Sequence, residues 1–486
     1  MACVRSRFAP LGASLATVDR QIKQHHSRSR PVDQWQQGET IDLEITDLSS
    51  SGDGLGRWQE RVVFVPDTVP GDLVRVRLVQ AKPTFGRAKV RQLLTPSPDR
   101  IRAACIVADK CGGCQWQSMN YAAQLRAKQQ QVVDAFTRIG GFADPGVLPI
   151  MSAADPLGYR NKATYPLGRS PEGQVKAGYY RQGSHKLVNL NQCPVQDERL
   201  NPLLSEVKRD IQERGWSVYN ETKHQGRLRH LSLRVGRRTG QQLLTLVSTA
   251  PNLKDIELQA QEWRERYPDL VGVCVNLNPE KTNAIFGVET LVIDGVPFIE
   301  EIFADLRFRI HATTFFQVNT EQAEQVLQVI LDELQLTGSE TIIDAYCGVG
   351  TLTLPLAQKA RRVMGLEVQP EAVAQGLANA GLNDIENVEF RAGDVGALLI
   401  DAAASLSDPL DIVVLDPPRK GCDRPVLDAL IELRPPRIVY MSCDPATLAR
   451  DLKILRDEGG YTLTKAQPAD FFPQTPHVEC VAFLVA

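Results

Sequence analysis

The stretch TIIDAYCGVGT, residues 341–351, is an apolar run that ends in a glycine-rich turn, and it decides the fold of the second half of the chain. Four further apolar runs follow it: RVMGLEV (362–368), NVEFRAG (387–393), DIVVLDPP (411–418) and RIVYMSC (437–443). Helix-like stretches such as PEAVAQGLANAG (370–381) lie between them. Near-continuous apolar strands that alternate with helices indicate a doubly wound, parallel α/β sheet. We therefore expect a Rossmann-like domain over residues 306–486, with ligands at the carboxyl ends of its strands.

The remainder of the chain divides into three segments of different composition. Residues 1–36 are predicted to be a disordered basic extension, because the stretch from Met1 to Val32 holds six basic side chains and one acid; an organellar transit peptide is the alternative. Residues 37–96 contain four short β runs broken by SSSGDGLG and VPGD, which predicts a small OB-like barrel. Residues 97–305 mix helix-like and strand-like runs and are expected to form a central α+β domain.

A stripe of basic residues in the barrel segment indicates what this segment could bind. Between residues 73 and 91 there are six basic residues and no acid, with Phe85 among them: Arg75, Arg77, Lys82, Arg87, Lys89 and Arg91. Alternation along a strand places the valines and the arginines of VRVR on opposite faces. The stripe favours nucleic-acid binding. The alternative is that these side chains only form a solvent-exposed strand face. The whole-chain net charge of -3 means that any basic surface is local.

Composition also sets the expected compartment. No run of about 18 apolar residues occurs, so no membrane-spanning helix is expected. Ten cysteines in 486 residues, without a secretory signal, favour a reducing cytoplasmic location. In such a compartment, clustered cysteines indicate metal binding or catalysis.

Several motif residues follow strand ends and describe a nucleoside-cofactor pocket. Gly348 lies in the turn after the first strand, where glycine lets the backbone approach a ligand. Glu367 ends the second strand, where an acid can accept hydrogen bonds from ribose hydroxyls. Asp394 follows the third strand, and Asp416 lies in the rigid LDPPRKG loop after the fourth. For the acids at the first strand ends a helix cap is the alternative, and for the LDPPRKG loop the alternative is a mere rigid turn.

Cys443 ends the fifth strand just before a helix, a position that lowers a thiol pKa and favours a nucleophilic thiolate. A packing cysteine is the alternative. Near the C-terminus, His477 and Glu479 flank an aromatic-proline turn, and either could accept a proton.

Four cysteines suggest a thiolate metal site. Cys105, Cys111 and Cys114 are closely spaced, and Cys193 lies far downstream. Three near cysteines and one remote one can form a four-thiolate site. Their spacing alone does not distinguish zinc from iron–sulfur, and chance free cysteines are the alternative.

These motifs together resemble the RNA uracil-5-methyltransferase family, in particular its 23S ribosomal RNA branch. The resemblance extends from about residue 38 to the end and rests on FFQVN (315–319), DAYCGVGT (344–351), LDPPRKG (415–421), SCDPATLARD (442–451) and FPQTPHVE (472–479). The barrel resembles a TRAM domain. Asp444 departs from the family pattern, in which asparagine is more usual; it could raise the thiol pKa or cap the next helix, and we expect the cap.

The resemblance implies an activity and its residues. It implies S-adenosylmethionine (AdoMet) as methyl donor, Cys443 as nucleophile and Glu479 as general base. It further implies cofactor contacts at Gln317, Tyr346, Glu367 and Asp416, and a [4Fe-4S] cluster in the central domain held by the four cysteines. The implied substrate is a flipped or single-stranded uridine of 23S rRNA. We favour a monomer, although the sequence does not determine the oligomeric state.

The chemistry agrees with this residue set. Uracil C5 is a poor nucleophile until a thiolate adds to C6, after which C5 can accept a methyl group and a base must remove its proton. Three rivals remain: a tRNA uracil-5-methyltransferase, which we expect to lack the barrel and the cysteines; a cytosine-5 or amino-group methyltransferase; and a non-catalytic RNA-binding ribosome-assembly factor.

Overall fold

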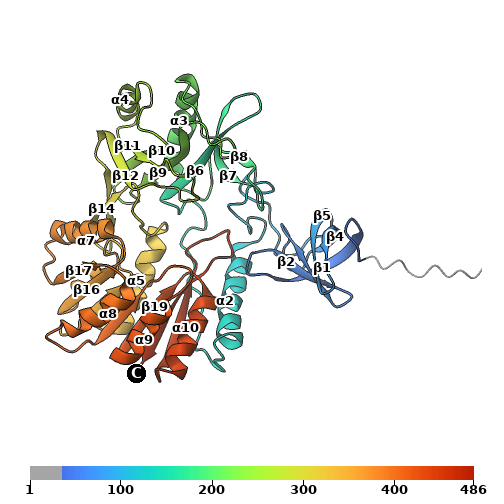
Figure 1. Cartoon of the computed structure of the whole chain (residues 1–486). Coiled ribbons are helices and arrows are strands. Elements are labelled where there is room, and N and C mark those ends of the chain that lie inside the picture. The colour runs from blue at the N-terminus through green and yellow to red at the C-terminus, as the bar shows by residue number, and fades with distance from the viewer. Residues whose placement is uncertain (1–34) are drawn as a thin grey trace, which may run out of the picture.

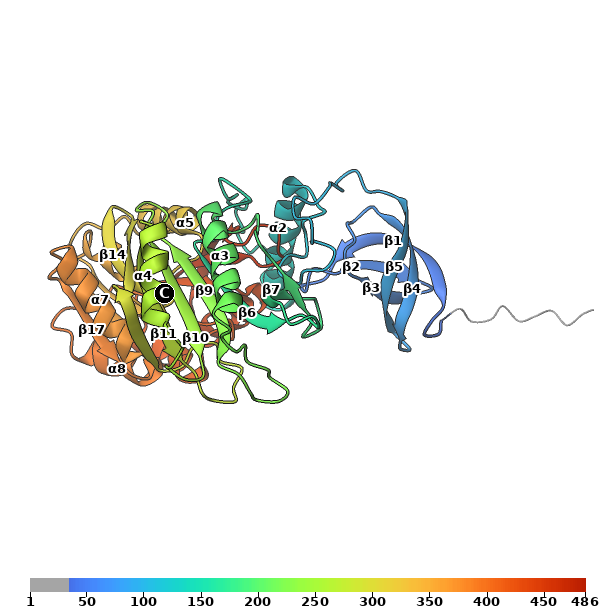
Figure 2. The ribbon, with the colours of Figure 1, turned by 90° about the horizontal axis from the view of Figure 1, so that it is seen from above.

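The computed structural model describes residues 35–486, which form a barrel, a central sheet domain and a C-terminal α/β domain (Figure 1). The expected basic extension, and the transit peptide considered in its place, lie outside the described residues apart from Trp35 and Gln36. Seen from above, the barrel lies at one end of the molecule (Figure 2). No helix of residues 35–486 has the length and apolar character needed to cross a bilayer.

The predicted barrel is confirmed and is closed in the order β1-β2-β3-β5-β4. Its strands are β1 (Thr40–Leu48), β2 (Gly54–Trp58), β3 (Arg61–Val65), β4 (Leu73–Ala81) and β5 (Phe85–Thr95). Alternation holds along β4, because Val74 and Val76 are buried while Arg75 and Arg77 are exposed. Part of the basic stripe is neutralised, since Arg75 makes two hydrogen bonds of 2.7 and 2.8 Å to Asp42 on β1.

The central domain is a seven-stranded sheet in the order β12-β11-β10-β9-β6-β7-β8. Its strands are β6 (Lys162–Arg169), β7 (Val175–Tyr180), β8 (Leu187–Asn189), β9 (Leu228–Val235), β10 (Gln242–Ser248), β11 (Leu270–Leu277) and β12 (Glu289–Gly295). The short 3-10 helix η1 (Glu198–Leu200) leads into α3 (Asn201–Glu213), which covers one sheet face together with α4 (Ile256–Arg266). This arrangement buries the apolar side of the strands.

The C-terminal domain confirms the doubly wound prediction. Its sheet has the order β17-β16-β15-β18-β19-β21-β20, in which the first five strands are parallel and β21 pairs antiparallel with both β19 and β20. The strands are β15 (Thr341–Ala345), β16 (Arg362–Glu367), β17 (Val388–Ala392), β18 (Ile412–Leu415), β19 (Arg437–Ser442), β20 (Thr462–Ala469) and β21 (Glu479–Val485). The helices are α5 (Thr320–Leu334), α6 (Thr353–Ala357), α7 (Pro370–Leu382), α8 (Val395–Ala404), α9 (Arg424–Leu433) and α10 (Pro445–Asp457).

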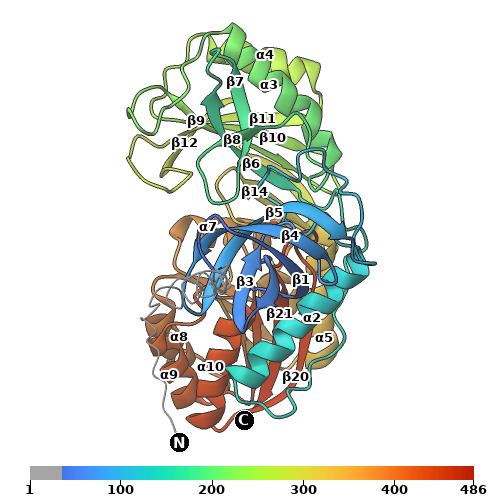
Figure 3. The same cartoon turned by 90° about the vertical axis from the view of Figure 1, so that its right-hand side faces the viewer.

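Two elements from earlier in the chain pack on this C-terminal domain. The helix α2 (Tyr121–Arg138) lies beside α10 and β20 (Figure 3). The hairpin of β13 (Phe298–Phe303) and β14 (Leu306–His311) places Phe303 and Phe308 in the core that surrounds Ile342. The core of the C-terminal α/β domain is therefore completed by residues that precede its first sheet strand in sequence.

Candidate active site

The motif residues gather where the parallel strands end. Strand order reverses between β15 and β18, and such a switch point leaves a crevice for ligands at the carboxyl ends. The glycine turn, Glu367, Asp394, Asp416 and Cys443 follow five neighbouring strands of this sheet. The fold therefore brings these predicted side chains to one edge of the sheet.

The turn after β15 leaves room beside its backbone. Tyr346 has φ +66° and Gly348 has φ +56°, so two residues of the turn adopt the left-handed conformation. For Tyr346 this conformation costs on the order of 1 kcal/mol or more, a strain typical of functional sites. A side chain at Gly348 would meet nothing within 4 Å, so the glycine serves the turn geometry and leaves open space for a ligand.

Two acids at the next strand ends are tied to backbone. Glu367 accepts hydrogen bonds from the backbone N–H of Gly348 at 3.1 Å and of Gln369 at 2.9 Å. Asp394 accepts from the backbone N–H of Ala397 at 3.1 Å and so caps α8. The cap considered as the alternative for Asp394 is therefore present, while its role toward a cofactor stays a prediction.

Gln317 and Asp416 meet across the crevice. The Gln317 side chain, 8% exposed, donates from Nε2 to Asp416 Oδ2 at 3.5 Å. Burial, with the nearby Asp344 carboxylate second, raises the pKa of Asp416 to about 7. A carboxyl group that is easily neutral can both accept and donate hydrogen bonds at a planar ring.

Cys443 stands between β19 and α10, as the sequence predicts. Asp444 is the N-cap of α10 and accepts from the backbone N–H groups of Ala446 and Thr447 at 2.9 and 3.2 Å. The expectation that Asp444 caps the helix is confirmed. The Cys443 thiol is half-buried, with part of its surface open.

The expected lowering of the Cys443 pKa is wrong. Burial, followed by the neighbouring Glu479 and Asp416 carboxylates, raises the pKa of this thiol to about 11, while Arg419 opposes them. Loss of solvation and two like charges outweigh the helix terminus. The thiol is therefore mostly protonated at neutral pH.

Glu479 is buried beside the thiol, at the start of β21. Its side chain is 5% exposed, and its Oε2 atom is buried without a hydrogen-bond partner among the described residues. Burial, followed by the charge of Asp416, raises the pKa of Glu479 well above its usual range. An unpartnered buried carboxyl of raised pKa is typical of a general base or acid.

His477 is the weaker proton acceptor of the two residues considered. It is half-buried and lies edge-on to Phe472, with ring centroids 6.1 Å apart. Burial, Arg419 and Lys128 lower its pKa. Glu479 and not His477 is among the main influences on the pKa of the Cys443 thiol, which points to Glu479 as the partner.

Arg419 is a site residue to which sequence reasoning assigned no role. It lies in the LDPPRKG loop, is exposed, and lowers the pKa values of Cys443, Glu479 and His477 through its charge. An arginine directly after the double proline was the available signal. Its position suits an anionic group of the substrate.

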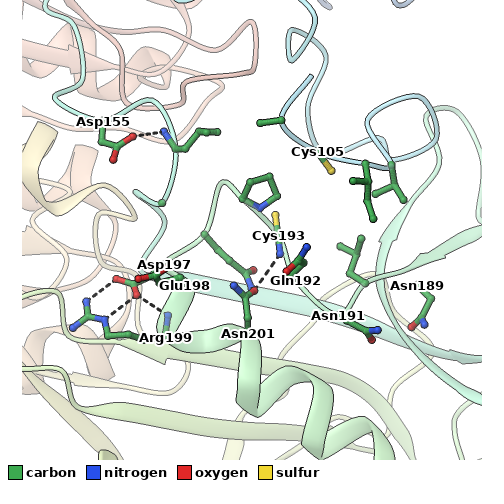
Figure 4. A pocket seen from close by; sticks show the side chains of 18 of the residues that line it. Cys105, Asp155, Asn189, Asn191, Gln192, Cys193, Asp197, Glu198, Arg199 and Asn201 are labelled. Atoms are coloured by element: carbon green, nitrogen blue, oxygen red, sulfur yellow. Dashed lines mark hydrogen bonds and ion pairs between the residues drawn. The ribbon is translucent and has the colours of Figure 1, made fainter. Parts of the chain in front are cut away.

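The four predicted metal-site cysteines line one cavity of about 210 Å³, together with Thr475 and Arg160. All four are half-buried, and burial raises the pKa of Cys114 to about 12. In residues 35–486 no three His, Cys, Asp or Glu side chains are placed to hold a single metal ion. A larger polar crevice of about 990 Å³ adjoins the cavity, and Cys105 and Cys193 lie on its wall (Figure 4).

Comparison with known proteins identifies the family. The TRAM domain family matches residues 34–90, and the family described as tRNA (Uracil-5-)-methyltransferase matches residues 282–394 and 404–486. An uncharacterized RNA methyltransferase of Nostoc sp. is 62% identical over 93% of this chain and 97% of its own length. One from Bacillus cereus is 41% identical over 92% and 97%.

A solved structure is also similar to this chain. The crystal structure of Pyrococcus abyssi tRNA (uracil-54, C5)-methyltransferase in complex with S-adenosyl-L-homocysteine matches with a TM-score of 0.72 and 29% identity, covering 92% of this chain and 100% of that chain. The chain therefore belongs to the uracil-5 RNA methyltransferase family, as an AdoMet-dependent RNA methyltransferase with an N-terminal TRAM domain.

Proposed function

We propose that this enzyme methylates C5 of a uridine in RNA through a covalent bond between the Cys443 sulfur and uracil C6. The observation that carries the proposal is the buried Glu479 carboxyl, whose Oε2 atom has no hydrogen-bond partner among residues 35–486, beside the half-buried Cys443 thiol. Amino-group methylation needs neither group. Cytosine-5 methylation could use the same pair, so the base is an outcome of the test.

The proposed reaction begins at the Cys443 thiol and ends with the removal of the C5 proton by Glu479. The Cys443 thiol, part of which is open to solvent, loses its proton to water, and the thiolate adds to C6. C5 then attacks the electrophilic methyl group that bound AdoMet would supply; the bond between this methyl group and the sulfonium sulfur breaks, and S-adenosylhomocysteine is the leaving group. Glu479 then removes the C5 proton, C5=C6 re-forms and the thiolate leaves. One proton is released per methyl group transferred.

The cofactor pocket is proposed at the strand ends. Glu367 would accept hydrogen bonds from the ribose hydroxyls of the cofactor. Asp394, at the next strand end, would lie beside the adenine of the cofactor. Gly348 and Tyr346 would place the turn backbone against the cofactor. Gln317 and Asp416, which already touch, would lie where the cofactor and the uracil meet.

The RNA substrate has two candidates. The resemblance to the 23S rRNA branch supports a 23S uridine, flipped out of its stack. A tRNA uridine is favoured by the Pyrococcus structure, a tRNA enzyme whose match covers 92% of this chain. The part of this chain outside that match is too short to contain both the N-terminal extension and the barrel, so the match includes barrel residues. Our expectation that tRNA enzymes lack the barrel is therefore wrong as a way to separate the two candidate substrates.

The four cysteines are proposed to hold a [4Fe-4S] cluster. Four thiol groups around one cavity match its donor set, and each thiolate binds a different iron. Such a cluster tolerates thiols that are too far apart to share one ion, which fits the absence of a single-ion site among residues 35–486. The cluster would join Cys193 to the loop that carries the other three cysteines.

The reaction is tested with radiolabelled AdoMet and separate rRNA and tRNA fractions from cells that lack the gene. We expect 5-methyluridine in one fraction, and mass mapping of that RNA identifies the uridine. The Cys443→Ala enzyme should lose methylation by at least about a thousandfold while it binds AdoMet as before. A methyl group on another nucleoside, or an active Cys443→Ala enzyme, would contradict the proposal.

A further inference from the structure

The loop 470–478, which leads from β20 into Glu479, is buried although it has no regular structure. Connecting loops normally lie at the surface, because a buried loop must find partners for all its backbone polar groups. Here only Phe472 and His477 are partly exposed. The partners of this loop therefore decide where Glu479 lies.

Many of those partners come from residues 115–128, which we name the brace. The backbone N–H of Gln474 donates to Gln124 Oε1 at 2.9 Å, and Gln124 Nε2 donates to Gln474 Oε1 at 3.1 Å. The Gln474 carbonyl accepts from the backbone N–H groups of Gln115 and Trp116, both at 3.1 Å. Gln124 is 1% exposed, so this reciprocal pair is sealed from water.

A buried ion pair fixes the start of the same loop. Lys128 and Asp470 have fully buried side chains and are 2.5 Å apart, and Lys128 Nζ also donates to the Phe472 carbonyl at 3.0 Å. A buried ion pair contributes little net stability because both charges lose their water. Its effect is to fix geometry between α2 and this loop, since its two partners are 342 positions apart in the chain.

Gln474 shows that the loop is held against a local preference. Its φ of +72° is in the left-handed region that side chains other than glycine rarely adopt. Such strain persists only where surrounding contacts over-determine it, and it is frequent at active sites. The contacts that hold the Gln474 backbone N–H and carbonyl come from the brace.

We propose that the brace positions Glu479 for removal of the C5 proton, with Gln124 and Gln474 as positioning residues. The inference rests on the proposed function, in which Glu479 is the base. Loosening the brace slows the last step, while AdoMet binding and the earlier attack by Cys443 continue. The covalent RNA–protein intermediate then accumulates.

Two substitutions test the brace. Gln474→Gly removes the side-chain contact, and glycine adopts the left-handed φ of this position without strain, so the fold is kept. Gln124→Met keeps the side-chain volume and removes the hydrogen bonds. Gln130→Met is the matched control, because Gln130 is exposed on the same helix and bonds only within it.

Three quantities are measured: tritium release from RNA labelled at uridine C5, the covalent adduct on denaturing gels, and AdoMet affinity. Both brace variants should release tritium roughly ten- to a hundredfold more slowly, with several-fold more adduct and AdoMet affinity within about twofold of the wild type. Gln130→Met should match the wild type.

Glu479→Gln separates the two claims. If it traps adduct and neither brace variant does, the brace proposal is overturned and the proposed function stands. If Glu479→Gln itself traps no adduct, the assignment of the base fails, and the brace proposal fails with it. A loss of tritium release that merely follows a loss of AdoMet affinity would show a general structural role and also overturns the brace.

Discussion

At the scale of single residues, both Cys443 and Glu479 lie where their ionised forms are disfavoured. Burial, followed by the Glu479 charge, raises the pKa of the Cys443 thiol to about 11, and burial raises the pKa of the Glu479 carboxyl well above its usual range. The thiolate is therefore a minor species at pH 7. Arg419 favours both ionised forms, so substrate binding next to this arginine can change the balance.

This pair sets the pH dependence that we expect. Because the thiolate and the carboxylate are both deprotonated forms with raised pKa values, the fraction of active enzyme increases with pH. The single-turnover methylation rate at saturating AdoMet and RNA should rise between pH 6.5 and pH 9, by up to about tenfold per pH unit. A rate that is flat or falls across that range would contradict the roles assigned to the pair.

These residues could be found from their motifs, but their charge states could not. The end of a strand and the start of a helix predicted where Cys443 lies. The pKa of its thiol depends instead on Glu479, which lies on another strand and reaches the thiol only through the antiparallel pairing of β19 with β21. Arg419 went unassigned because a charged residue in a turn is usually only solvated.

At the scale of elements, α10 presents Cys443, and its N-terminus depends on Asp444. Asp444→Ala removes the acceptor for two backbone N–H groups and should lower the free energy of unfolding by about 1 kcal/mol. Asp444→Asn keeps a side-chain oxygen there and should stay within a few tenths of a kcal/mol of the wild type. Urea unfolding measures both, and equal losses in the two variants would refute the cap.

The strands of the α/β domain were predictable because each buried parallel strand is a near-continuous apolar run, as in IVVL of β18. The position of α2 was not predictable. Its apolar residues, such as Val132 and Phe136, indicate a buried face but do not say which surface covers it. In the structure that surface belongs to α10 and β20, which follow only after the whole central domain in the chain.

At the scale of the whole molecule, the loop 470–478 connects the cysteine cavity with the active site. Gln115 and Trp116, which hold Gln474, directly follow Cys114, and Thr475 of the same loop lines the cysteine cavity. A cluster in that cavity would therefore stabilise the loop before Glu479. The four cysteines were recognisable as a group from their spacing, whereas this connection to the base depends on tertiary contacts.

Metal content and its removal test this connection. Anaerobically purified protein should carry about four irons per chain, the number in a [4Fe-4S] cluster. Removal of the iron by a chelator should increase hydrogen exchange in residues 105–120 and 470–478, with β15 and β16 as unchanged controls. Stoichiometric zinc in place of iron, or unchanged exchange in 470–478 after removal, would contradict the proposed cluster and its link to the loop.

The covalent step is tested most directly by mass spectrometry of the Glu479→Gln enzyme after incubation with AdoMet and substrate RNA, followed by nuclease and protease digestion. We predict a peptide in which the Cys443 sulfur carries a methylated uridine nucleotide, because the methyl group has been transferred while the C5 proton has no base to remove it. An enzyme that makes 5-methyluridine at the wild-type rate with Cys443 unmodified throughout would contradict the covalent mechanism.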